Sequence, residues 1–252
     1  MISGIRSEAL KLRTVRTTYG LVAGVVALIL LQVLGTVFAS GSNGTPGLTV
    51  PEVARSVYAA AGSATVLVLT IGIIAMTSEY RHMTITSTFL ADPIRRRVLA
   101  AKMITLAFAG AAIGVLCVVI TVGLASLLLA TRDHAGVSSS TIAAISGGAV
   151  LAYTIYAVIG VALGALIRIQ PLAIMVAVVY MFILEPLIVA LLPKVGRWLP
   201  GGAANSILQN QGVGNFTESD YLPVWSAALL LLGYGIAFAV IAAWTTLRTD
   251  IT

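Results

Sequence analysis

Charged side chains are scarce in this sequence, and their scarcity excludes a soluble globular domain. Only 10% of the 252 residues are charged, whereas 59% are hydrophobic. A soluble domain of this length carries roughly a quarter charged residues. The composition therefore predicts an integral membrane protein.

Reactive and metal-binding residues are also rare. Cys117 is the single cysteine, which excludes a disulfide within the chain, and the two histidines, His82 and His134, belong to no cluster with metal-ligand spacing. The G-x-x-x-x-G-K-[ST] motif that holds ATP phosphates is absent. We therefore expect no enzymatic activity and no cofactor in this chain.

Apolar runs, by contrast, are long and frequent. A helix needs about 20 apolar residues to cross a bilayer, and the pattern predicts one all-α transmembrane domain over residues 1–252. The expected spans lie at about 20–40, 57–76, 98–130, 141–167, 171–193 and 223–246. Because the third span is longer than the bilayer requires, we expect its start, with Lys102, to project into water.

Basic residues are distributed unevenly between the loops. With the N-terminus inside, eleven of the 15 Lys and Arg residues fall in inner segments and four, namely Arg55, Arg132, Lys194 and Arg197, in outer ones. Cytoplasmic segments of membrane proteins carry such an excess. We therefore expect both termini in the cytoplasm of a protein in the plasma membrane. The same bias explains the net charge of +6 without a nucleic-acid partner.

The first 19 residues are basic and weakly amphipathic. Ile2, Ile5, Ala9 and Leu12 recur at helical spacing, but Glu8 interrupts their apolar arc. We expect a helix lying on the inner membrane surface. The alternative is a positively charged segment that serves only to orient the first span.

Residues 78–97, which we call the insert, form a polar and basic stretch between the second and third spans. Asp92 followed by Pro93 is typical of a helix start, so we expect the third helix to begin there. Before it, an apolar edge is rimmed by Thr and Ser and includes Phe89 and Leu90. Such an edge favours docking to another protein. The alternative is an ordinary solvated loop.

The insert resembles the first cytoplasmic loop of type-2 ABC exporter permeases, which reads approximately E-x-R-x-G-T, then L-x-x-P-x-x-R and a Lys. The match rests on Glu79, Arg81, Thr84, Thr88, Phe89, Leu90, Pro93, Arg95 and Lys102. Met83 departs from the pattern, because the family usually has glycine there. The basic N-terminal segment, the six spans, and the stretch around Glu185 and Pro186 with Asn205 beyond it also fit this family.

The resemblance implies a fold, partners and a role for the insert. It implies a dimer of permeases with two copies of a separate P-loop ATPase that binds ATP and Mg²⁺. It also implies short re-entrant outer helices after the fifth span. The insert would contain a coupling helix between spans 2 and 3 that docks into the ATPase. The coupling residues would be Glu79, Arg81, Thr84, Thr88, Phe89, Leu90, Pro93 and Arg95. The implied activity is outward transport of a hydrophobic or amphipathic substrate.

Glu185 is the one good candidate for an ionisable group inside the membrane. Such groups are costly and usually functional. Pro186 follows it, so we expect Glu185 to leave helical geometry. One interpretation is a contact with a substrate or cation, or a proton-linked gate, in a path that includes Tyr180 and Phe182. The alternative is a carboxylate satisfied by Lys194, Arg197 or free backbone N–H groups. An ion-driven secondary transporter and a membrane anchor or sensor subunit remain alternative functions.

Overall fold

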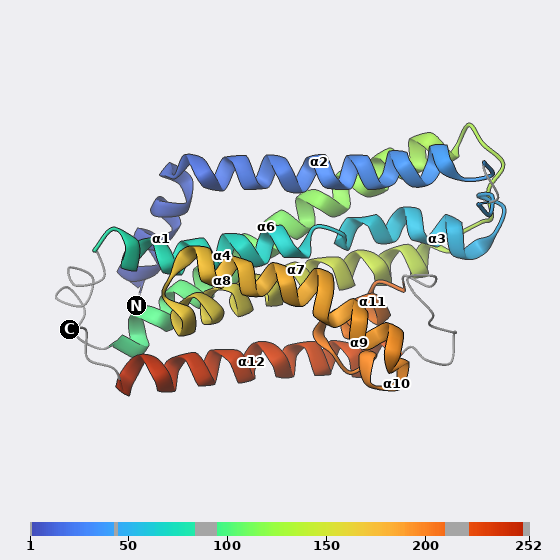
Figure 1. Ribbon diagram of the computed structural model, residues 1–252. Coiled ribbons are helices and arrows are strands. Elements are labelled where there is room, and N and C mark those ends of the chain that lie inside the picture. Colours follow the sequence, from blue (N-terminus) through green and yellow to red (C-terminus); the bar gives the residue numbers. More distant parts are fainter. Residues whose placement is uncertain (1, 43–44, 84–94, 210–221, 249–252) are drawn as a thin grey trace.

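The computed structural model describes residues 2–42, 45–83, 95–209 and 222–248, and all regular secondary structure in those ranges is helical (Figure 1). The helices are α1 (Ile2–Thr14), α2 (Arg16–Ala39), α3 (Pro51–Ala59), α4 (Thr65–Arg81), α6 (Arg95–Leu129), α7 (Ser139–Ile167), α8 (Gln170–Val179), α9 (Glu185–Leu191), α10 (Pro193–Gly196), α11 (Pro200–Ile207) and α12 (Val224–Arg248). Expectations that rest on Thr84, Thr88, Phe89, Leu90, Asp92 and Pro93 lie outside the described residues.

Six helical stretches are long and apolar enough to cross a membrane, which confirms the expected number of spans. They are Arg16–Ala39, Pro51–Arg81, Arg97–Leu129, Ser139–Ile167, Gln170–Leu191 and Val224–Trp244. The chain is therefore a multi-pass membrane protein. α1 is also helical, as the N-terminal spacing predicted.

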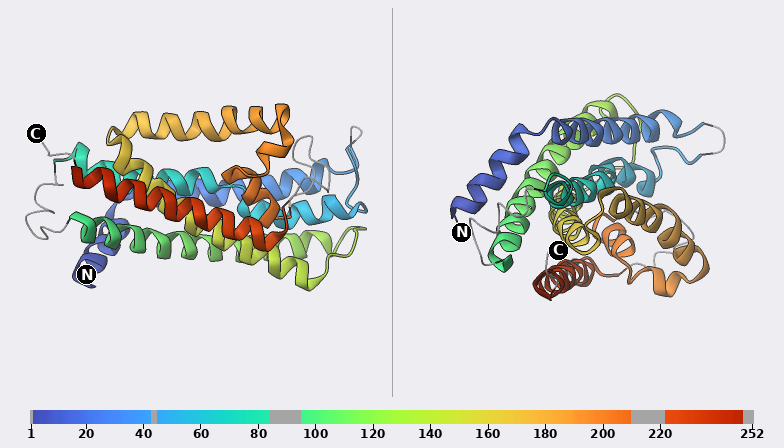
Figure 2. Two further views of the ribbon diagram at one scale, coloured as in Figure 1. Left: turned by 90° about the horizontal axis from the view of Figure 1, so that it is seen from below. Right: turned by 60° about the vertical axis from the view of Figure 1, so that its left-hand side comes forward.

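The spans form an elongated bundle with α4 and α7 at its centre (Figure 2). The start of α1, the end of α4, the start of α6 and the end of α12 lie at one end of the bundle (Figure 1). We call this the insert end, because the insert connects α4 to α6 there. α3 and α11 lie toward the other end, which we call the far end.

Glycines allow α4 and α7 to approach closely. A Cβ atom on Gly72 would collide with the carbonyl oxygen of Ala157, and one on Gly160 would collide with that of Leu69. Gly164 has the same role one turn further along α7, whereas Gly147 faces open space. Gly160 and Gly164 of the fourth span therefore serve close helix packing.

The second span is not the continuous helix expected over residues 57–76. α3 ends at Ala59, a 3-10 turn covers Ala60–Gly62, and α4 begins at Thr65. The break is tolerated because the phenol of Tyr153 accepts a hydrogen bond from the freed N–H of Ala64 at 3.3 Å. Backbone groups in a membrane require such internal partners. Small residues at the break leave room for Leu208, whose side chain lies against Gly62.

The fifth span is irregular for a different reason. A π-helical turn over Tyr180–Leu184 separates α8 from α9. The expectation that Glu185 leaves helical geometry is wrong, because its φ of −66° and ψ of −49° are α-helical. Pro186 lies in the first turn of α9, where a missing N–H is tolerated. The π-helical turn over Tyr180–Leu184 accommodates the distortion that Pro186 causes.

Candidate functional site

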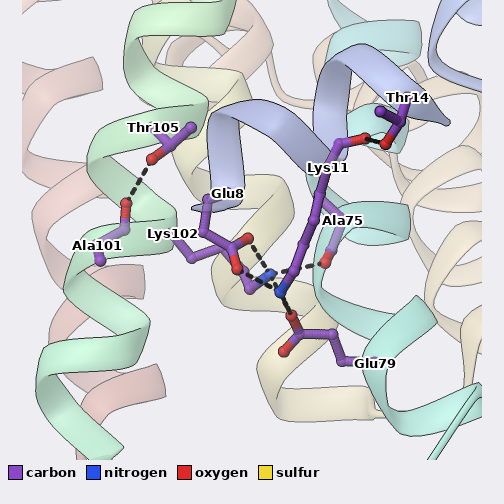
Figure 3. A network of polar contacts seen from close by, with 8 residues as sticks. All are labelled: Glu8, Lys11, Thr14, Ala75, Glu79, Ala101, Lys102 and Thr105. Carbon is purple, nitrogen blue, oxygen red and sulfur yellow. Dashed lines mark hydrogen bonds and ion pairs between the residues drawn. The ribbon is translucent and has the colours of Figure 1, made fainter. Parts of the chain in front are cut away.

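Four charged side chains form a closed cluster at the insert end (Figure 3). The ammonium group of Lys102 lies 2.5 Å from Oε2 of Glu8 and 3.1 Å from Oε1 of Glu79, and it also donates to the carbonyl oxygen of Ala75 at 3.1 Å. Lys11 lies 2.7 Å from Oε1 of Glu8 and 2.6 Å from Oε1 of Glu79. Two carboxylates and two ammonium groups alternate, so their charges cancel. We call these four residues the ion cluster.

Lys102 corrects a sequence-based expectation. It was expected to project into water, but it is only 1% exposed. An ammonium group has three N–H donors, and the three contacts of Lys102 match that number. Buried charges require such pairing. In the sequence, Glu8 indicated that a buried cation was needed. It lies within the apolar arc of α1 and therefore on the buried face of that helix.

The pKa values of the two α1 members follow from the cluster. Burial alone would raise the pKa of Glu8, but the charges and hydrogen bonds of Lys102 and Lys11 outweigh it and lower that pKa. Burial would likewise lower the pKa of Lys11, but hydrogen bonds to Glu79 and Glu8 raise it. Both residues are therefore held in their charged forms.

The ion cluster joins α1, α4 and α6 beside the insert. Glu79 thus ties α4 to its neighbouring helices rather than offering an exposed surface, since it is buried. Arg81 is exposed, and its guanidinium donates to the side chain of Gln170 at the start of α8, at 3.5 Å. Arg168, just before α8, lies with its guanidinium carbon 5.6 Å from the centre of the Tyr80 ring. Arg95 begins α6.

Met83 has an unusual backbone in the described part of the insert. Its φ is +55°, in the left-handed region, and its side chain is 80% exposed. Glycine populates this region without steric cost, whereas methionine does not. The chain turns away from α4 at this residue.

Glu185 is the second buried carboxylate, toward the far end. It is 5% exposed, and its Oε1 accepts hydrogen bonds from the backbone N–H groups of Gly201 at 2.5 Å and Gly202 at 3.2 Å, in the first turn of α11. No described lysine or arginine forms an ion pair with it, so the expected partners Lys194 and Arg197 do not satisfy it. The backbone N–H groups of α11, the third kind of expected partner, donate to Oε1 alone.

A polar cavity of about 500 Å³ adjoins this carboxylate. It is bounded by α2, both sides of the break between α3 and α4, the irregular part of the fifth span, and α11. Its polar lining residues are Gln32, Ser56, Ser63, Thr65, Tyr156, Glu185 and Asn205.

An apolar cavity of about 500 Å³ lies next to the polar one, because both are lined by Tyr156 and Met181. Tyr180 lines the apolar cavity, together with Tyr234 of α12. Phe182 lines neither cavity and is exposed on the outside of the bundle. The structure therefore brings Tyr180 near Glu185 but leaves Phe182 apart.

Metal binding was considered next. No group of three or more His, Cys, Asp or Glu residues in the described ranges has metal-binding geometry. Neither a protein-family model nor a curated protein matches the chain.

Proposed function

We propose that this chain is the transmembrane permease subunit of an ATP-binding cassette exporter. It moves a hydrophobic or amphipathic substrate outward, and a separate cytoplasmic P-loop ATPase supplies the energy. It acts as a homodimer with two ATPase copies in the plasma membrane, with its insert end in the cytoplasm. α1 lies at the inner interface, and α10 and α11 form the re-entrant outer segment.

The ion cluster is the observation that carries this proposal. It joins α1 to α4 and α6, the two helices that the insert connects. A force applied to the insert therefore acts on three helices as one unit, since buried ion pairs resist separation. A subunit driven by an external ATPase requires such a rigid input element.

The backbone of Met83 also supports the resemblance that the insert shows. In the family pattern E-x-R-x-G-T, glycine usually occupies this position, between the Arg and the Thr. The left-handed φ of +55° is the conformation in which glycine is favoured. The departure at Met83 thus changes the residue while keeping the turn that the pattern implies.

An ion-driven secondary transporter is the second candidate. Transporters of that class are built with interrupted helices near the substrate site, and the described residues include two interruptions, at 60–64 and at Tyr180–Leu184. Such a protein would work without an ATPase, so identifying its partner separates the two candidates.

Co-purification tests the proposal. We would tag the chain, solubilise native membranes in mild detergent and identify the proteins that co-purify in stoichiometric amounts. The test variant replaces residues 84–91 with eight Gly and Ser residues, and the matched control replaces residues 211–218 in the same way. We expect a P-loop ATPase with the wild type and the control but not with the test variant. Recovery of no ATPase in several mild detergents, or equal recovery with all three chains, would contradict the proposal.

A further inference from the structure

The polar cavity is bordered by the two interrupted helices of the bundle. Ser63, in the break of the second span, and Met181, in the π turn of the fifth, both line it. Irregular backbone at membrane depth is tolerated where it lines a cavity, and π turns occur frequently at functional sites. Because both helix interruptions line the same cavity, we interpret the cavity as a binding site and not as a packing defect.

Glu185 gives this cavity an incompletely satisfied negative charge. Both of its hydrogen bonds involve Oε1, and no described residue donates to Oε2. Its donors are neutral N–H groups, which reduce the cost of the charge without cancelling it. A carboxylate that is 95% buried and lacks a cationic partner among the described residues favours a positively charged ligand.

Gly201 fixes the position of this carboxylate. A Cβ atom at Gly201 would lie 2.7 Å from Oε1 and 2.9 Å from Oε2 of Glu185. Any larger residue would therefore displace the carboxylate from its place in the cavity wall. The close approach is possible because glycine has no side chain.

The apolar cavity supplies the second half of the site. Tyr156 and Met181 form the boundary between the two cavities, and the rest of the apolar lining includes Leu163, Val176 and Phe238. Tyr180 and Tyr234 add aromatic rings to this lining, and such rings offer a large apolar contact area to hydrocarbon. One end of the combined space thus suits a cationic head, and the other suits a hydrocarbon body.

We propose that the two cavities form one binding site for an amphipathic organic cation. The cationic head pairs with Oε2 of Glu185, and the apolar body occupies the space beyond Tyr156 and Met181. This inference rests on the proposed function in naming the exported substrate class, but binding itself requires no ATPase. Anions are rejected by Glu185, and neutral amphiphiles leave its charge unpaired.

Radiolabelled dodecyltrimethylammonium tests this site directly. The purified wild-type permease is placed in phosphatidylcholine nanodiscs, and saturable binding is measured against empty nanodiscs. Dodecanoate and dodecanol carry the same tail with a negative or no charge, so they serve as competitors. We expect saturable binding of the ammonium probe that neither competitor displaces at equal concentration. Displacement of the probe by dodecanoate and dodecanol as efficiently as by unlabelled dodecyltrimethylammonium would overturn the charge-selective site.

Two variants locate the site, and one controls for changes elsewhere. Glu185→Gln removes the charge and keeps an oxygen that accepts from Gly201 and Gly202, and Gly201→Ala keeps the charge but displaces it. We expect each to weaken binding about tenfold or more, because each breaks a desolvated charge pair. Glu52→Gln in α3 removes another carboxylate, which lines neither cavity, and should bind like the wild type. Wild-type binding by both test variants would contradict the inference.

The outcome separates this inference from the proposed function. Cation binding that depends on Glu185, in a protein with no ATPase partner, would support the site and contradict the exporter. An ATPase partner without cation binding would contradict the site alone. Size-exclusion profiles show whether each variant folds, and Gly201→Ala provides a second route if Glu185→Gln aggregates.

Discussion

The two buried carboxylate centres of this protein satisfy their charges in opposite ways. At the insert end, Glu8 and Glu79 are neutralised by Lys11 of α1 and Lys102 of α6. Toward the far end, Glu185 receives only backbone N–H donors and adjoins a cavity. The ion cluster is neutral as a whole and holds helices together. Glu185 lies beside a cavity without a cationic partner among the described residues, so it is available to a ligand.

The difference teaches that burial alone does not distinguish a structural charge from a functional one. All three of these carboxylates are less than 9% exposed. The distinction lies in whether the chain itself supplies the counter-charge. Four variants and one change of pH test this contrast.

Removing Lys102 should have the largest effect on stability. In Lys102→Met, Glu8 and Glu79 share the single ammonium of Lys11, and loss of one partner from a buried ionic group typically costs about 3–5 kcal/mol. We expect a correspondingly lower free energy of unfolding for the detergent-solubilised protein. Arg97→Met, at an exposed position of α6, is the matched control and should change stability by less than about 0.5 kcal/mol.

A double variant sharpens this result. In Glu8→Met with Lys102→Met, Lys11 and Glu79 remain as a pair, so the double change should cost less than the sum of the two single changes. Strict additivity in this double-mutant cycle would show that Glu8 and Lys102 do not interact.

Gly201→Ala, beside Glu185, should have the next largest effect on stability. Its new methyl group would overlap the carboxylate of Glu185, and overpacking of this kind costs about 1–3 kcal/mol. Gly147→Ala is the control, because nothing lies within 4 Å of the added Cβ atom. Equal thermal unfolding temperatures for the two alanine variants would contradict the described position of Glu185.

Acid should weaken the ion cluster through Glu8. The folded-state pKa of Glu8 lies below its ordinary value of 4.5. Its charge therefore contributes stability above pH 4.5, and that contribution disappears as the pH falls through the folded-state pKa. Glu8→Gln lacks this contribution, so the difference in unfolding temperature between wild type and Glu8→Gln should shrink below pH 4.5. A difference that stays constant from pH 7 to pH 3 would contradict the pairing of Glu8 with Lys102 and Lys11.

Glu185→Gln should have the smallest effect on stability. The amide oxygen still accepts from Gly201 and Gly202, and the cost of burying a charge is removed at the same time. We expect a change within about 1 kcal/mol in the free energy of unfolding. A loss as large as that of Lys102→Met would show that Glu185 is structural and would abolish the contrast between the two centres.

The sequence predicted the scaffold well because hydrophobic length is a local signal. Six apolar runs identified the spans, and the isolated acid before Pro186 identified the far centre. The partner of Glu8 could not be found in this way, since Lys102 lies 94 residues away and meets it only when α1 packs on α6. Glu8 within an apolar arc showed that a partner was needed but not which one.

The two helix interruptions also escaped sequence reasoning. Gly62 and Ser63 are common enough in membrane helices that they do not identify a break, and the break depends on contacts from Leu208 and Tyr153 that lie far away in sequence. Pro186 indicated a distortion at Glu185 itself. It did not show that the wide turn would precede Glu185 and leave that residue helical.

ATP hydrolysis by the co-purified complex in nanodiscs, measured against dodecyltrimethylammonium concentration, tests most directly whether the two ends belong to one transporter. We predict hydrolysis that rises with the cation and saturates in the wild type and in Glu52→Gln, with no such rise in Glu185→Gln. Hydrolysis that does not respond to the cation, or that responds equally in Glu185→Gln, would contradict the account.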